Sequence, residues 1–134
     1  MRPRTRITLA SLALLLISTL LVACGSSTVK IGWREFSGSK RKRANYVTFD
    51  GVQSKAFRVE AGQTIDLVCD VTVEKGALNI QLIAPDGETL WKETFREDRE
   101  AFVGVTAAED GLHILQIEGA KTGGGFDISW SVES

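Results

Sequence analysis

Few side chains of this 134-residue chain have the chemistry that catalysis or metal binding requires. It contains a single histidine, His113, and two cysteines, Cys24 and Cys69. No G-x-S-x-G stretch is present, so neither a nucleophile and base pair nor a histidine-based metal cluster can be assembled. The carboxylates Asp66 and Asp70 lack the ligand spacing of a calcium loop. We therefore predict that the protein is not an enzyme and has no metal or cofactor.

Four consecutive cations, Lys40, Arg41, Lys42 and Arg43, follow a turn-like triplet at residues 37–39. Such a run is commonly a solvated loop whose charges repel each other. It could equally attract anionic lipid headgroups or anionic polymers of a cell envelope. Both interpretations stay open, and the four residues are candidate binding residues.

Tryptophans offer a second kind of binding surface, because a flat aromatic face can stack on a sugar ring. Alternation of apolar and polar residues places Trp130 in the core. Trp33 and Trp91 are left as the tryptophans that could be exposed, and Trp91 is the candidate for stacking on carbohydrate.

The first 23 residues have the pattern of a secretory signal peptide, which we expect to be helical. A basic stub with Arg2, Arg4 and Arg6 precedes 17 uncharged residues, 7–23, that end in small residues. The run is at the short limit for spanning a bilayer, which favours cleavage. Removal of these residues leaves 13 basic against 17 acidic residues. A mildly acidic mature chain argues against a nucleic-acid partner.

The segment from Leu21 to Gly25 resembles the lipobox of bacterial lipoproteins. The resemblance implies that Cys24 becomes the first mature residue and carries a diacylglycerol group, with palmitate-type acyl chains as the membrane anchor. More than one acyl chain is needed for anchoring that does not readily reverse. The alternatives are an ordinary signal peptide or an uncleaved anchor. We expect a protein attached to the cell membrane and exposed on its extracytoplasmic side.

From residue 45 onward, apolar residues recur with period two, and Gly, Asp and Pro interrupt the pattern about every ten residues. This pattern predicts an all-β fold, an antiparallel, jelly-roll-like β-sandwich of about eight strands. Turns are expected at 50–51, 85–87 and 110–111. The predicted strands are 46–49, 56–59, 64–73, 77–83, 89–95, 101–106, 112–117 and 126–132.

The same alternation predicts which side chains are buried. Cys69 falls on the apolar side of its strand, whereas Asp66 and Asp70 fall on the polar side together with Val68, which breaks the pattern. We expect His113 to face solvent. Residues 24–43 are predicted to be a lipidated tether that includes the basic run and a short strand at 29–36, and residues 44–134 are predicted to be the sandwich domain.

Several turn and strand motifs resemble small lipoproteins that are common in Gram-positive bacteria. Their β-sandwich is similar to GOLD-type and bacterial pre-peptidase C-terminal domains, and the resemblance covers most of the chain from about Val47. It implies a β-sandwich and carries over no catalytic residue. The motifs are Phe49-Asp50-Gly51, Gly76-Ala77-Leu78-Asn79-Ile80, Pro85-Asp86-Gly87, Asp110-Gly111 and Gly125-Phe126-Asp127-Ile128-Ser129-Trp130.

These features together indicate a lipoprotein of the cell envelope that acts as a non-enzymatic binding or structural module. Its expected partners are the membrane, through Cys24, and an envelope polymer or protein. The alternative function is a carbohydrate-binding module, and a small hydrolase is the least favoured because no nucleophile and base pair is present.

Overall fold

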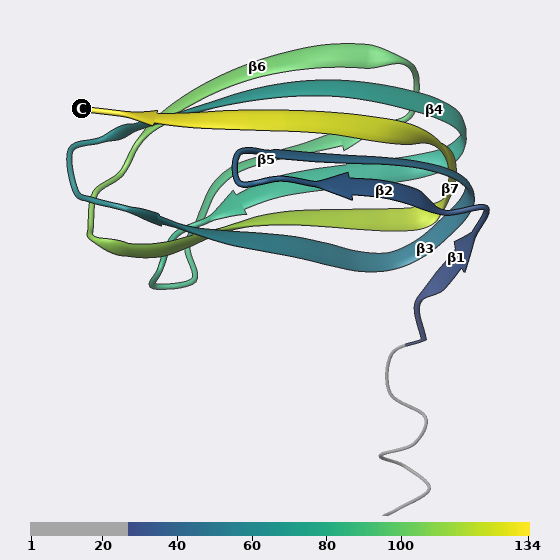
Figure 1. The fold of residues 1–134 in the computed structure, drawn as a ribbon, viewed down its shortest axis with the longest axis horizontal. Helices are drawn as coiled ribbons and strands as arrows, with labels where there is room; N and C mark the ends of the chain where they lie inside the picture. Colours follow the sequence, from purple (N-terminus) through teal and green to yellow (C-terminus); the bar gives the residue numbers. More distant parts are fainter. Residues whose placement is uncertain (1–26) are drawn as a thin grey trace, which may run out of the picture.

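The computed structural model describes residues 27–134, which form seven antiparallel strands and no helix (Figure 1). The predicted signal peptide and Cys24 lie outside these residues. Within the described part, no helix has the length and apolar character to cross a membrane. The strands are β1 (Val29–Ile31), β2 (Arg34–Ser37), β3 (Arg41–Val59), β4 (Thr64–Ile83), β5 (Thr89–Phe95), β6 (Arg99–Thr106) and β7 (Gly111–Glu133).

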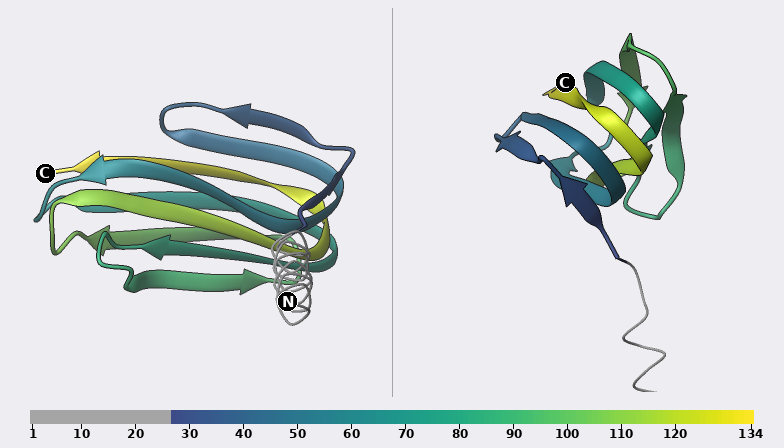
Figure 2. Two further views of the ribbon diagram at one scale, coloured as in Figure 1. Left: turned by 90° about the horizontal axis from the view of Figure 1, so that it is seen from below. Right: turned by 90° about the vertical axis from the view of Figure 1, so that its right-hand side faces the viewer.

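Three long strands, β3, β4 and β7, bend together at one end of the molecule and run through both layers of the sandwich (Figures 1 and 2). They have 19, 20 and 23 residues, more than three times the ordinary strand length of about 5–6 residues. The β6 layer contains β2, β6, the first halves of β3 and β4, and the second half of β7. The β5 layer contains β5 and the other halves of the long strands.

The bend requires positions without a side chain, because three backbones cross closely there. A Cβ atom on Gly76 would lie 2.5 Å from the carbonyl oxygens of Ala120 and Lys121, and the backbone of Gly76 has a φ of +68°. A Cβ atom on Gly124 would overlap the carbonyl oxygen of Thr72. The pairing of β7 with β3 and with β4 shifts in register at the bend. These shifts allow the strands to turn without losing their pairing farther along.

The core lies between the two layers and is formed by alternate residues of each strand. Cys69 and Trp130 are both buried, as the alternation predicted. Trp130 stacks on Phe57, with ring centroids 5.5 Å apart, and so links the two layers. The largest fully buried hydrophobic side chains are Phe49, Phe95, Ile65, Leu67, Leu78, Ile80, Leu82, Leu115, Ile117, Ile128 and Val59.

The structure confirms the all-β class and the antiparallel sandwich, but the strands are connected differently from the prediction. The eight predicted segments are β5, β6 and the straight halves of three bent strands. Residues 50–51 are part of the bend in β3 and do not form a turn between strands. The glycines of the bend resemble turn glycines in sequence, because both allow unusual backbone geometry.

Two further expectations were wrong. The sandwich does not begin at residue 44, because β1 and β2 both pair with β3, and the basic run forms the start of β3. Four adjacent charges concealed the alternation in which Lys42 and Ala44 point inward. His113 does not face solvent: it is fully buried, because it has the same parity along β7 as Leu115 and Ile117.

The contacts at the bend predict that Gly76→Ala destabilises the protein far more than Gly62→Ala. Both glycines have a positive φ, which costs an alanine about 1–2 kcal/mol. Only Gly76 has backbone atoms in the way, whereas nothing lies within 4 Å of a Cβ atom on Gly62. Urea unfolding of a soluble form that begins at Gly25 should show a loss of about 3 kcal/mol or more for Gly76→Ala. Equal losses for the two variants would contradict this account of the bend.

Candidate functional site

The four residues of the basic run have different environments. Arg41 and Arg43 point outward from β3, on the open face of the β6 layer, because alternate residues of a strand lie on opposite faces. Lys42 lies between them and points inward, and its side chain is only 6% exposed. Lys40 precedes the strand. The pleat of β3 therefore divides the run between two faces of the sheet.

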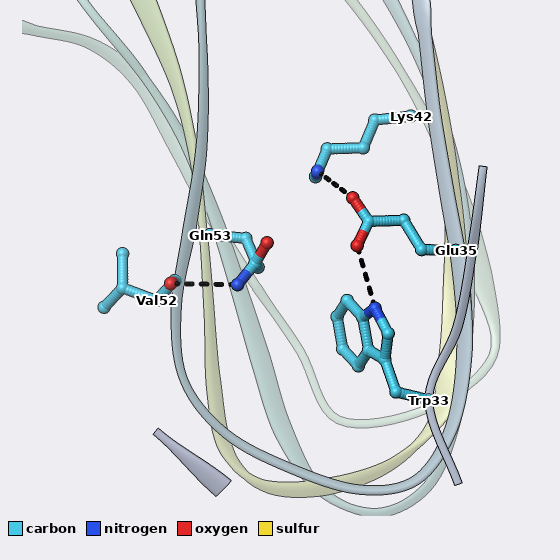
Figure 3. A network of polar contacts seen from close by, with 5 residues as sticks. All are labelled: Trp33, Glu35, Lys42, Val52 and Gln53. Atoms are coloured by element: carbon cyan, nitrogen blue, oxygen red, sulfur yellow. Dashed lines mark hydrogen bonds and ion pairs between the residues drawn. The ribbon is translucent and has the colours of Figure 1, made fainter. Parts of the chain in front are cut away.

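Lys42 is held by a polar cluster at the open end of the core (Figure 3). Its Nζ donates a hydrogen bond of 2.6 Å to Glu35, and the indole nitrogen of Trp33 donates one of 2.8 Å to the other oxygen of the same carboxylate. These two hydrogen bonds lower the pKa of Glu35. Trp33 also stacks on Tyr46, with ring centroids 5.4 Å apart. Trp33 and Lys42 therefore fasten the β2–β3 hairpin to the core and are not free to bind a ligand.

A row of five side chains crosses the open face of the β6 layer, one from each strand. Cross-strand pairing places Phe36 on β2 opposite Arg43 on β3, and Arg43 opposite Asp127 on β7. Asp127 is opposite Asp70 on β4, and Asp70 is opposite Glu100 on β6. Four spacings between neighbouring strands make this row about 19 Å long.

A second row lies beside the first, one step along the strands. It consists of Arg41, Ser129, Val68 and Phe102, which are paired in register across β3, β7, β4 and β6. Arg41 reaches across to the first row, and its guanidinium donates two hydrogen bonds, of 2.8 and 2.5 Å, to the two carboxylate oxygens of Asp127. This ion pair lowers the pKa of Asp127, and the charge of Arg43 adds to the effect.

Three adjoining depressions hollow this face, with volumes of about 340, 400 and 260 Å³. Each depression shares lining residues with the other two, so they form one continuous surface, which we call the β6-layer groove; the residues that line two of the three are Arg41, Arg43, Asn45, Asp70 and Asp127. The remaining lining residues are Arg34, Glu35, Phe36, Val68, Thr72, Glu100, Phe102, Gly125, Phe126 and Ser129.

Exposed aromatic side chains lie at the two edges of the groove. Phe36 on β2 is 59% exposed and Phe102 on β6 is 73% exposed. A phenylalanine gains stability from burial, so two large exposed rings beside a hollow are more informative than scattered exposed apolar residues. The groove therefore offers an apolar contact at each end and polar groups between them.

The charges that line the groove nearly balance, with three arginines against four carboxylates. Asp70 faces Asp127 on one side and Glu100 on the other, an arrangement of like charges that destabilises a sheet. Within the described residues, neither Asp70 nor Glu100 takes part in a salt bridge. Their carboxylates are thus available as hydrogen-bond acceptors for a ligand.

The other residues considered from sequence lie away from the groove. Trp91 is half-buried on β5, opposite Leu82 in the β5 layer, and packs against the core. His113 is buried in the same layer, and its Nε2 has no hydrogen-bond partner among the described residues. Burial raises the pKa of the Cys69 thiol to about 12, so it stays protonated. No set of three metal-ligating side chains occurs in residues 27–134.

Most of the groove was not recognised from sequence, because its residues come from five separate segments. One signal was present: Val68 breaks the alternation on β4 by placing an apolar side chain on the polar face, between Asp66 and Asp70. The structure places Val68 beside Phe102, and both side chains line the groove.

No protein-family model and no curated protein matches the chain. Among solved structures, TmCBM61 in complex with β-1,4-galactotriose is similar, with 12% identity and a TM-score of 0.45 over 75% of this chain and 86% of that one. A carbohydrate-binding module from Cellvibrio mixtus lichenase 5A in complex with cellotriose has 12% identity and a TM-score of 0.41, over 81% and 96%. A family 29 module complexed with mannohexaose has 15% identity and a TM-score of 0.42, over 82% and 81%. Likenesses at this level assign no ligand and no binding site to this chain.

The ion pair in the groove predicts that Arg41→Gln raises the pKa of Asp127 towards that of an ordinary aspartate. Because the pKa is lowered in the folded state, the pair stabilises the fold at neutral pH, and this contribution is lost as the pH falls through the lowered value. An NMR titration of the side-chain carboxyl carbons measures the change. Arg58→Gln, on the half of β3 in the β5 layer, is the matched control. An unchanged pKa of Asp127 in Arg41→Gln would contradict the assigned pair.

Proposed function

We propose that the protein is a non-catalytic, glycan-binding module that a lipid anchor holds at the outer surface of the cell membrane. The observation that carries the glycan assignment is the β6-layer groove, in which hydrogen-bond donors on β3 and acceptors on β4 and β6 lie between two exposed phenylalanines. The groove is open along its length, which suits an extended polymer better than a small enclosed ligand.

A polyhydroxylated ligand fits both the polar and the apolar parts of the groove. Sugar hydroxyls donate and accept hydrogen bonds, and the groove supplies donors from Arg43 and Asn45 and acceptors from Asp70 and Glu100. Sugar rings also present apolar C–H faces, which aromatic side chains such as Phe102 can cover. A neutral glycan places no net charge against the nearly balanced lining.

Electrostatic binding of an anionic envelope polymer is the competing proposal. It is weakened by the ion pairs that residues of the basic run already form within the protein. Arg41 is already neutralised by Asp127, and Lys42 is neutralised by Glu35 inside the sandwich. Lys40 and Arg43 are then the members of the run without a salt bridge in the described part of the chain. Two cations beside several carboxylates form a poor anion-binding surface.

The lipid anchor is supported by the sequence alone, through the basic stub, the uncharged run and the lipobox at Cys24. Anchoring at a surface raises the effective concentration of a binding module towards neighbouring polymers. Modest affinity in an open groove is then sufficient for function.

Phe102→Ala is expected to weaken binding of a neutral glycan about tenfold, because roughly 1.5 kcal/mol of apolar contact is lost. Affinity electrophoresis against xylan, mannan, β-glucan and purified peptidoglycan can identify the ligand, and calorimetry measures the change. Leu112→Ala is the matched control, since Leu112 is also exposed but lies on β7 opposite Arg58, away from the groove.

Salt dependence distinguishes the two proposals. Glycan binding through the groove should be nearly independent of ionic strength. Binding only to an anionic polymer, abolished by salt and by the Lys40→Gln and Arg43→Gln double variant, would support the electrostatic proposal instead. Equal affinities in Phe102→Ala and Leu112→Ala would remove the groove from consideration.

Cys24→Ser is expected to abolish acylation and to move the protein out of the membrane fraction. Cell fractionation with metabolic labelling by a palmitate analogue measures both effects, and Cys69→Ser is the control because Cys69 is buried in the core. If Cys24→Ser yields a processed, acylated protein that still sediments with membranes, Cys24 is not the lipid attachment site.

A further inference from the structure

The exposed apolar side chains of the described residues are unevenly distributed. Of eight large exposed ones, four lie at the end where β3 bends: Val29 and Ile31 on β1, and Val47 and Val52 on β3. Val47 is 61% exposed and Ile31 is 54% exposed. We call these four residues the bend-end patch.

The chain enters the sandwich beside this patch. β1 pairs with residues 48–50 of β3, and Thr28 lies against Gly51 in the bend. Val29 comes only five positions after Cys24 in the sequence, a span of at most about 17 Å when fully extended. A bilayer that holds the uncharged run of residues 7–23, or acyl chains on Cys24, must therefore lie close to the bend.

Both positively and negatively charged residues surround the patch, and most of the positively charged ones are lysines. Lys75 donates a hydrogen bond of 2.8 Å to the Thr48 hydroxyl, and the backbone amide of Lys121 donates to the Asp50 carboxylate. Glu74 is exposed beside Lys75. With both signs present, the apolar side chains are the distinctive feature of this end, and the flexible lysines can extend towards lipid phosphates.

We propose that the bend-end patch rests on the lipid bilayer and sets the orientation of the whole domain. This inference rests on the proposed membrane attachment but is independent of the glycan. The strands of the β6 layer then rise away from the membrane, and the row from Phe36 to Glu100 crosses them parallel to its surface. Arg43 lies four positions before Val47 on β3, so this row is about 13 Å from the bend-end patch.

Fluorescence quenching on vesicles tests this orientation with the full, acylated chain. A dye is attached to Val47→Cys in one protein and to Leu112→Cys in another. Labelling is specific because Cys69 is buried and Cys24 carries the anchor. The vesicles contain equal parts of phosphatidylcholine and phosphatidylglycerol, with a spin label on some headgroups. We expect a strong loss of fluorescence at position 47 and little loss at position 112.

A second substitution separates contact from mere proximity. Ile31→Asp places a charge in the patch and is expected to reduce the quenching at position 47, whereas Leu112→Asp in the same labelled protein should not. Vesicle sedimentation, run in parallel, reports the anchor. If the chain sediments but both labels are quenched equally, the domain has no fixed orientation and this inference is wrong while the anchor stands. If the chain does not sediment with vesicles, both the anchor and this inference are wrong.

Discussion

The whole structure depends on one steric condition, the close crossing of three backbones at the bend. Gly76 and Gly124 leave room there that no side chain could share with the neighbouring carbonyl oxygens. Because β3, β4 and β7 turn together, β7 keeps β3 and β4 as its two neighbours in both layers of the sandwich. Any shift in pairing in one layer would be transmitted to the other, so the bend also fixes the register that aligns the rows of the groove.

The β6 layer shows how the pleat of a strand separates functions along a run of similar residues. Lys42 points into the sandwich, where its pairing with Glu35 offsets the cost of burying a charge. Its neighbours Arg41 and Arg43 point to the open face, where Arg41 is paired with Asp127 and Arg43 has no salt bridge within residues 27–134. A block of charge in the sequence thus becomes two ion pairs, one inside the sandwich and one on its open face, and one further arginine on the surface proposed to bind a ligand.

Much of the fold, but little of the groove, could be predicted from the sequence. Period-two alternation identified the straight parts of the strands and the burial of Cys69 and Trp130, because burial is decided locally by the pleat. The bends were missed, since a glycine within a strand and a glycine in a turn obey the same backbone rules. The row from Phe36 to Glu100 combines five segments up to 91 residues apart, and only the register of the folded sheet brings them together.

The pairing of β1 and β2 with β3 has a mechanical consequence. A polymer bound in the proposed groove would pull on the β6 layer, whereas the proposed anchor would pull on residue 27, just before β1. The pull on residue 27 reaches the sandwich first through the few hydrogen bonds that pair β1 with residues 48–50 of β3. Under load, β1 would detach before the long strands separated, and its residues would lengthen the tether while β2, which carries Phe36, stayed paired with β3.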